Sequence, residues 1–397
     1  MITAAKLLFL MLIAPLASAA TASPLTIGET FTIDSKVLGE KRRINVYLPP
    51  QYAESADTRL PVLYMPDGGI AEDFLHVAGL VQVSTGNGTM RPFILVGIEN
   101  TERRRDMTGP TQNEKDKKIA PRVGGSEAFR KFIRNELMPA VKARYRTTGE
   151  TAIVGESLAG LFAVETFFRE PDLFDTYIAF DPSLWWNDHA LVSDAPAALE
   201  KWRGGAKTLY FVSTEEKENA ALMEQLASAL TRTAPAGVRW HYEKMPEEKH
   251  ATIYHPAALK AFRALFRPGV CPPAGEPAAD WQRTAAMDQW QLLLPPGMTL
   301  VQSNRVFVHG GQVWEGGGAR VTLSFGMFAE SSFDETAGDR CRATVGDRDV
   351  FVVAGKTKVL AWYGHGVASD EPVLEVFSES EEELRRLAPL VLTLRRP

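Results

Sequence analysis

The 397-residue chain lacks an excess of positive charge, has few cysteines, and has no long apolar run beyond its first residues. Its 44 Lys and Arg residues are outnumbered by 49 Asp and Glu residues, which gives a net charge of -5. This balance argues against nucleic-acid binding, because proteins that hold a phosphate backbone generally carry a positive field. The composition, 45% hydrophobic and 23% charged, is typical of a globular protein and argues against a disordered, collagen-like or coiled-coil chain.

The chain's most apolar segment stands at its start. Lys6 precedes the apolar run Leu7–Leu16, which is followed by the small-residue pattern Ala17-Ser18-Ala19. This arrangement predicts a signal peptide over residues 1–19 and a periplasmic or extracellular mature protein. An N-terminal membrane anchor is the alternative, but the run is shorter than the roughly 20 residues that span a bilayer. We therefore expect no stable membrane insertion.

The chain has only two cysteines, Cys271 and Cys341. An exported protein meets oxidising conditions, and an even number of cysteines leaves no thiol over, so we predict a disulfide between them. Two separate buried thiols are the alternative. Their spacing does not resemble a zinc site.

Short apolar runs alternate with longer helical stretches up to residue 267. This alternation predicts an α/β fold over residues 20–267, with a mostly parallel sheet flanked by helices. Residues 268–280 are rich in proline and glycine and are predicted to form a linker. Residues 281–397 contain several short strand patterns and one charged helical pattern, which predict a small, sheet-rich α+β accessory domain.

The sharpest local motif is Gly155-Glu156-Ser157-Leu158-Ala159, which lies between a predicted buried strand and a predicted helix. A nucleophile elbow holds its serine in a strained turn, so the residues two positions away on either side must be small. Gly155 and Ala159 meet this requirement, although the usual pattern ends in glycine. We predict that Ser157 is a nucleophile. A serine that only caps the helix is the alternative.

A serine nucleophile needs an imidazole as its base, and α/β hydrolases supply that histidine from a loop late in the domain. His250 follows the last predicted strand and precedes the final helix, so it is the predicted base. His255 lies five residues further on, beside Pro256, where a capping or packing role is expected.

The third member of a triad is a carboxylate, expected after a strand and between serine and histidine in chain order. The segment Ser213-Thr214-Glu215-Glu216-Lys217-Glu218 offers three glutamates. We predict Glu216 as the acid, with Glu215 as the alternative and Glu218 placed in the first turn of the next helix. A serine–histidine pair without a strong acid also remains open.

Two backbone N–H groups are expected to bind the oxyanion of a tetrahedral intermediate. One is that of Leu158, directly after the nucleophile. The other is assigned to Gly69, in the glycine turn Pro66-Asp67-Gly68-Gly69 that follows an early strand. A plain Asp-Gly turn is the alternative for this second segment.

Residues 27–266 resemble the putative esterase family of α/β hydrolases, which includes esterase D-like enzymes and ferric-enterobactin esterases. The resemblance rests on the order of serine, acid, histidine and glycine turn, and on three further segments. These segments are Val96–Thr101 followed by Arg104, Asp181–Asn187, and Glu248-Lys249-His250. Departures from the family pattern are Ala159 in the elbow, Asp181 where the family has serine, and Ser213 before the predicted acid. The resemblance does not extend to the C-terminal residues.

The resemblance implies hydrolysis of carboxylic esters through an acyl-serine intermediate, without metal or organic cofactor. Its candidate substrates are small-molecule esters such as siderophore lactones or acylated sugars. Trp185 and Trp186 form an aromatic wall for the substrate or are part of the core. Arg104, within Arg103–Arg105, binds an anionic substrate or belongs to a solvated basic loop.

Two other functions fit the same sequence. An acyltransferase would use the same acyl-serine with an alcohol in place of water. An inactive hydrolase fold would serve as a binding module. The sequence does not set the oligomeric state or the role of the C-terminal residues.

Overall fold

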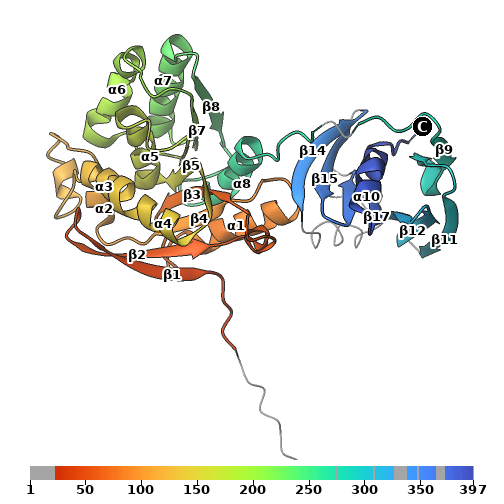
Figure 1. Cartoon of the computed structure of the whole chain (residues 1–397). Helices are drawn as coiled ribbons and strands as arrows, with labels where there is room; N and C mark the ends of the chain where they lie inside the picture. The colour runs from red at the N-terminus through yellow and green to blue at the C-terminus, as the bar shows by residue number, and fades with distance from the viewer. Residues whose placement is uncertain are drawn as a thin grey trace, which may run out of the picture.

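The computed structural model describes residues 23–272, 275–306, 309–325, 338–346, 348–363 and 372–396. The predicted signal peptide lies outside the described residues. The chain forms two separate larger β-sheets, one of eight strands and one of seven (Figure 1). Within the described residues, no helix is long and apolar enough to cross a bilayer.

The eight-stranded sheet has the order β1-β2-β4-β3-β5-β6-β7-β8. The pairs β1–β2 and β2–β4 are antiparallel, and all other neighbours in this sheet are parallel, as the alternating sequence pattern predicts. Its strands are β1 Glu29–Ser35, β2 Glu40–Tyr47, β3 Leu60–Pro66, β4 Ile94–Ile98, β5 Thr147–Glu156, β6 Thr176–Phe180, β7 Lys207–Ser213 and β8 Val238–Lys244.

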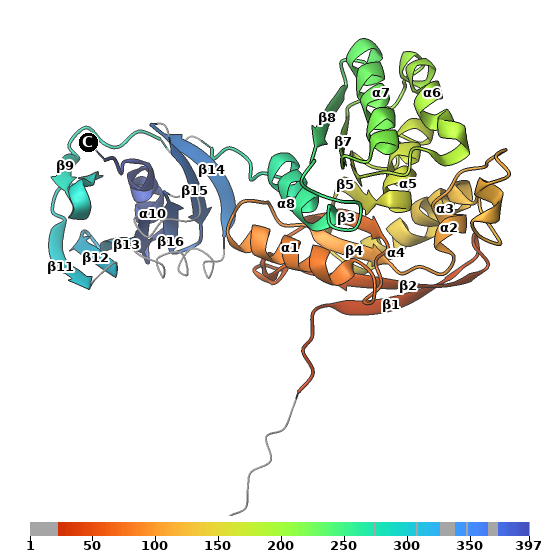
Figure 2. The same cartoon turned by 180° about the vertical axis from the view of Figure 1, so that it is seen from behind.

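Helices cover both faces of this sheet (Figures 1 and 2). One face packs against α1 Phe74–Gly86 and α8 Tyr254–Leu265. The other face packs against a second set of helices. These are α3 Ser126–Phe132, α4 Met138–Arg144, α5 Ser157–Arg169, α6 Trp186–Glu200 and α7 Lys217–Thr233, and the short α2 Arg103–Asp106 precedes them. Because both faces are covered, the central strands are apolar throughout, and every residue of β3 and β4 is buried.

The seven-stranded sheet is antiparallel throughout, with the order β11-β12-β13-β17-β16-β15-β14. Its core is separate from that of the first sheet and includes Trp290, Trp314 and Tyr363. The strands are β11 Thr299–Val306, β12 His309–Gly316, β13 Ala319–Phe325, β14 Asp339–Val345, β15 Arg348–Ala354, β16 Lys358–Trp362 and β17 Val373–Ser378. A two-stranded sheet of β9 Gln282–Ala285 and β10 Gln291–Leu294 and the helix α10 Glu381–Leu387 complete this region. The α+β character predicted for this region is confirmed.

Cys271 and Cys341 form a disulfide, as predicted. Next to it, Val270 pairs with Arg342 of β14, and the N–H of Cys271 donates to the Arg342 carbonyl at 2.8 Å. The start of the predicted linker is therefore bonded to the second sheet. The placement of the domain boundary at residues 268–280 stays a prediction.

Candidate active site

Ser157 lies at the junction of β5 and α5, where the chain turns sharply. Its φ of 59° is in the left-handed region, which is strained for a residue with a side chain. A β-carbon added at Gly155 would lie 2.5 Å from the Cβ of Ala159, so the strand and the helix approach each other too closely for any residue but glycine. This is the strand–turn–helix geometry of a nucleophile elbow.

His250 contacts Ser157 from the loop between β8 and α8. Its Nε2 lies 3.1 Å from the Ser157 Oγ, within hydrogen-bond distance. His255, the other candidate, packs instead near His76, with 5.6 Å between ring centroids. The two residues selected from the sequence as nucleophile and base are thus brought together across 93 positions of the chain.

The carboxylate that orients His250 is Asp181, which corrects the prediction of Glu216. The Asp181 Oδ2 lies 2.6 Å from the His250 Nδ1, and the Asp181 side chain is fully buried. Glu216 is exposed, and so is the alternative acid, Glu215. The reason is the order of the strands: β6 lies between β5 and β7, so a residue directly after β6 is nearer to Ser157 than the loop after β7.

The loop after β7 and the first turn of α7 have a different role, because they hold Asp181 in place. The Asn219 Nδ2 donates to the Asp181 Oδ1 at 3.0 Å, and the backbone N–H of Thr214 lies 3.4 Å from the same oxygen. On the nucleophile's side, the N–H of Ser183 donates to the Ser157 carbonyl at 3.0 Å. Asp181 itself has a φ of 41°, so its backbone also turns sharply after β6.

This contact changes the basicity of His250. The hydrogen bond that His250 donates to Asp181 raises the pKa of His250 above its usual value, against the opposing effect of burial, and the Glu156 carboxylate adds to the rise. A more basic imidazole accepts the serine proton more readily. The signal in the sequence was Asp181 itself, an acidic residue directly after the buried run Tyr177–Phe180.

The two predicted oxyanion donors differ in their surroundings. Leu158 is in the first turn of α5, where backbone N–H groups have no partner within the helix. The N–H of Gly69 donates to the Glu72 Oε2 at 2.6 Å, and the Glu72 carboxylate also accepts from the N–H of Asn100 at 3.3 Å. In this structure the N–H of Gly69 is therefore already bonded to a side chain of its own turn.

The two tryptophans differ in burial, and only one of them is part of the core. The Trp186 indole is 5% exposed, and its Nε1 donates to the Gly109 carbonyl at 2.9 Å, so this residue is part of the core. Trp185 is 44% exposed and is free to form the wall of a site.

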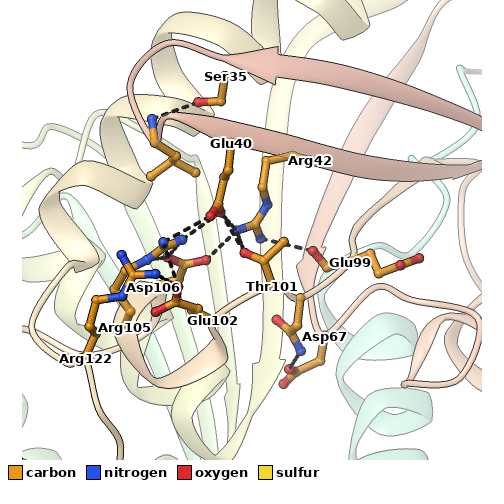
Figure 3. A network of polar contacts seen from close by, with 12 residues as sticks. Ser35, Glu40, Arg42, Asp67, Glu99, Thr101, Glu102, Arg105, Asp106 and Arg122 are labelled. Carbon is orange, nitrogen blue, oxygen red and sulfur yellow. Dashed lines mark hydrogen bonds and ion pairs between the residues drawn. The ribbon is translucent and has the colours of Figure 1, made fainter.

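An ion-pair network holds α2, which carries Arg103–Arg105 (Figure 3). Arg105 is bonded to Glu40 and Asp106, and Arg42 bonds to the same two carboxylates. The Arg105 hydrogen bond is the main reason that the pKa of Glu40 falls to about 2, although burial opposes it. Arg42 and Arg105 therefore join α2 to β2, and their charges are already paired with carboxylates.

Arg104 has a different environment from its neighbours. Its guanidinium donates to the Ile119 carbonyl at 2.9 Å, whereas Arg103 forms two hydrogen bonds with Asp67 and Arg122 pairs with Glu102. Arg104 and Arg122 line a cavity of about 570 Å³. Within the described residues, Arg104 is thus the arginine of this cavity with no carboxylate partner.

Comparison with known proteins places the first sheet in a family. The family model described as "Putative esterase" matches residues 35–266. The ferri-bacillibactin esterase BesA of Bacillus subtilis is 31% identical over 206 residues, which cover 48% of this chain and 66% of that protein. The siderophore triacetylfusarinine C esterase of Aspergillus fumigatus is 32% identical over 193 residues, covering 45% of this chain and 64% of that protein. The chain thus spans slightly less than two thirds of the length of these relatives.

Solved structures resemble the same part of the chain. An IroE-like serine hydrolase from Shewanella oneidensis matches with a TM-score of 0.56 and 29% identity, over 60% of this chain and 80% of that one. The BES protein from Bacillus cereus matches with a TM-score of 0.54 and 22% identity, over 62% of this chain and 97% of that one. These similarities confirm the α/β-hydrolase fold that the motifs predicted.

Proposed function

We propose that this chain, which belongs to the putative esterase family, is a serine hydrolase that cleaves carboxylic esters through an acyl-serine intermediate. The observation that carries the proposal is the hydrogen-bonded series Ser157–His250–Asp181, with distances of 3.1 and 2.6 Å. A hydroxyl, an imidazole and a buried carboxylate in this order can activate the serine as a nucleophile.

In the proposed reaction, the His250 Nε2 takes the proton of Ser157 as the Oγ attacks the ester carbonyl carbon. Asp181 stabilises the imidazolium that forms. The N–H groups of Leu158 and Gly69 donate to the oxyanion, once the Glu72 carboxylate has left Gly69. His250 then gives its proton to the leaving alcohol. In the second half, His250 takes a proton from water as the water oxygen attacks the acyl carbon. The bond between this carbon and the Ser157 Oγ then breaks, the acid leaves, and His250 returns the proton to Ser157.

The substrate class is proposed as siderophore esters, because both relatives described above are named for this activity. The exposed Trp185 ring and the unpaired Arg104 guanidinium support a substrate that carries aromatic and anionic groups. Acylated sugars remain the second candidate class among small esters.

Export of the protein is also proposed. The disulfide between Cys271 and Cys341 supports it, because disulfides persist in oxidising compartments. We further propose that residues 20–267 are the catalytic domain and residues 281–397 an accessory domain, since the two sheets have separate cores.

Two measurements test the proposed function. A fluorophosphonate probe should label the wild-type protein and leave Ser157→Ala unlabelled, and a catecholate trilactone should be hydrolysed by the wild type alone. An added acceptor alcohol distinguishes hydrolysis from acyl transfer, since a transferase would produce a new ester. Absence of both labelling and hydrolysis in the wild type would contradict the proposal.

A further inference from the structure

A second cavity adjoins the catalytic imidazole. It has a volume of about 350 Å³, and His250 forms part of its wall. The other polar residues that line it come from the start of α1 and the residue before it, from the elbow, and from the start of α8 and the loop before it. They are Asp73, His76, Glu156, Thr252, Tyr254 and His255. The proposed reaction assigns no proton transfer to any of these six, and among them only Glu156 affects it, through the pKa of His250.

Two buried polar atoms in the cavity wall have no hydrogen-bond partner among the described residues. The Tyr254 side chain is 6% exposed, and its hydroxyl is one of them. The other is the His76 Nδ1. The opposite nitrogen of the same ring, Nε2, lies 3.2 Å from the Asp73 Oδ1. The two rings pack edge to face at 4.8 Å, which fixes both orientations. Buried polar groups are nearly always paired, so these atoms point to a ligand.

The charge of this cavity is negative. Asp73 and Glu156 both line it, and both interact electrostatically with the Tyr254 hydroxyl. Arg103 is the cation that interacts with these two carboxylates, but its guanidinium already forms two hydrogen bonds with Asp67, at 2.7 and 2.8 Å. Within the described residues, no lysine or arginine forms an ion pair with either carboxylate of this cavity, and the groups near them are imidazoles, His76 beside Asp73 and His250 near Glu156.

The pKa of Glu156 reflects its burial and its charged neighbours. Burial is the main reason that the pKa of Glu156 rises to about 7; His250 opposes the rise, and the Asp73 carboxylate adds to it. A positive group placed between Asp73 and Glu156 would remove the repulsion between these two side chains.

We infer that this cavity is the subsite for a primary ammonium group carried by the ester substrate, an inference that rests on the proposed ester hydrolysis. An ammonium group has three N–H donors, and the Asp73 carboxylate, the Glu156 carboxylate and the Tyr254 hydroxyl offer three acceptors. Because His250 lines the same cavity, the ammonium group would lie within a short alkyl chain of the ester that Ser157 attacks.

Matched ester pairs test the subsite. On the acyl side the pair is methyl 6-aminohexanoate and methyl hexanoate, and on the alcohol side it is 6-aminohexyl acetate and hexyl acetate. In one of the two pairs, the amine-bearing ester should have a kcat/KM about tenfold higher, which corresponds to one charge-assisted hydrogen bond. The ratio within each pair cancels any general effect on catalysis.

Variants locate the effect. Asp73→Asn and Glu156→Gln keep the shape of each side chain and should each bring the ratio close to one. Glu216→Gln is the matched control, because Glu216 also interacts electrostatically with His250 but is not part of the cavity wall, so the ratio should stay near tenfold. A further test needs no variant. Wild-type hydrolysis of hexyl acetate should be inhibited more strongly by n-butylammonium than by its neutral control, n-butanol.

The inference would be overturned by a wild-type ratio near one in both pairs, or by a ratio that Asp73→Asn leaves unchanged. An equal advantage for 6-hydroxyhexyl acetate would also overturn it, in favour of a hydroxyl subsite. These results differ from failure of the proposed function, in which no neutral ester is hydrolysed and the fluorophosphonate probe does not react.

Discussion

Replacement of Asp181 by asparagine is the sharpest test of the triad. The Asp181 carboxylate accepts from the His250 Nδ1 at 2.6 Å and is fully buried. In Asp181→Asn the shape of the side chain is kept, but an amide N–H can face Nδ1 and so favour the tautomer whose Nε2 carries the proton. That imidazole cannot accept the serine proton, and the same change in other serine triads lowers kcat by about 10⁴.

We therefore expect kcat to fall by about 10³ to 10⁴, which corresponds to roughly 4 to 5.5 kcal/mol of transition-state stabilisation. KM should change little, because Asp181 is buried behind His250. The assay is steady-state hydrolysis of a 4-nitrophenyl ester, with Glu216→Gln as the control for removal of a nearby charge. The reasoning is refuted if Asp181→Asn keeps more than a tenth of the wild-type kcat, or if Glu216→Gln causes the larger loss.

The other predictions concern the pH profile, the elbow and the disulfide. The hydrogen bond that His250 donates to Asp181 raises the pKa of His250, so kcat/KM should fall on acidification through a pKa above 6.5. This acidic limb of the pH profile should move to lower pH in Asp181→Asn, and an unmoved limb would assign it to another group. Gly155→Ala should abolish activity and lower thermal stability, because the new methyl would lie 2.5 Å from the Cβ of Ala159. As the control, Ala159→Gly should keep turnover within about threefold of the wild type. A wild-type melting temperature and turnover in Gly155→Ala would contradict the close approach. Cys341→Ser should cost about 2 to 4 kcal/mol in the free energy of unfolding, measured by denaturation of the second sheet, because the bridge closes a long loop; an unchanged midpoint would show that the bridge adds no stability.

Local patterns were sufficient for the fold and for two of the three residues of the proposed triad. Ser157 could be found because an elbow demands small residues at fixed spacing, and that demand is visible in Gly155 and Ala159. His250 could be found because chain order and the preceding strand narrow the choice. The strands could likewise be predicted from short-range patterns, and the disulfide from the count of two cysteines.

The acid could not be found in this way, because its position depends on which strands are neighbours. The sequence gives strands in chain order, and only the sheet order β5-β6-β7 brings the end of β6 next to the elbow. Asp181 and Glu216 both follow strands and both precede helices, so local pattern alone does not separate them. Burial separates them, because Asp181 is fully buried and Glu216 is exposed.

The same argument applies to the second oxyanion donor. The sequence predicts that Gly69 lies in a tight turn. It does not show that the carboxylate of Glu72 accepts a hydrogen bond from the N–H of Gly69, at 2.6 Å. This contact closes a turn of four residues, since the Glu72 N–H also donates to the Gly69 carbonyl at 3.0 Å. Burial raises the pKa of Glu72, so a negative charge at this position is already costly before a second one forms on the substrate. The oxyanion and the Glu72 carboxylate compete for one donor, and the proposed reaction therefore requires that Glu72 moves whenever the tetrahedral intermediate forms.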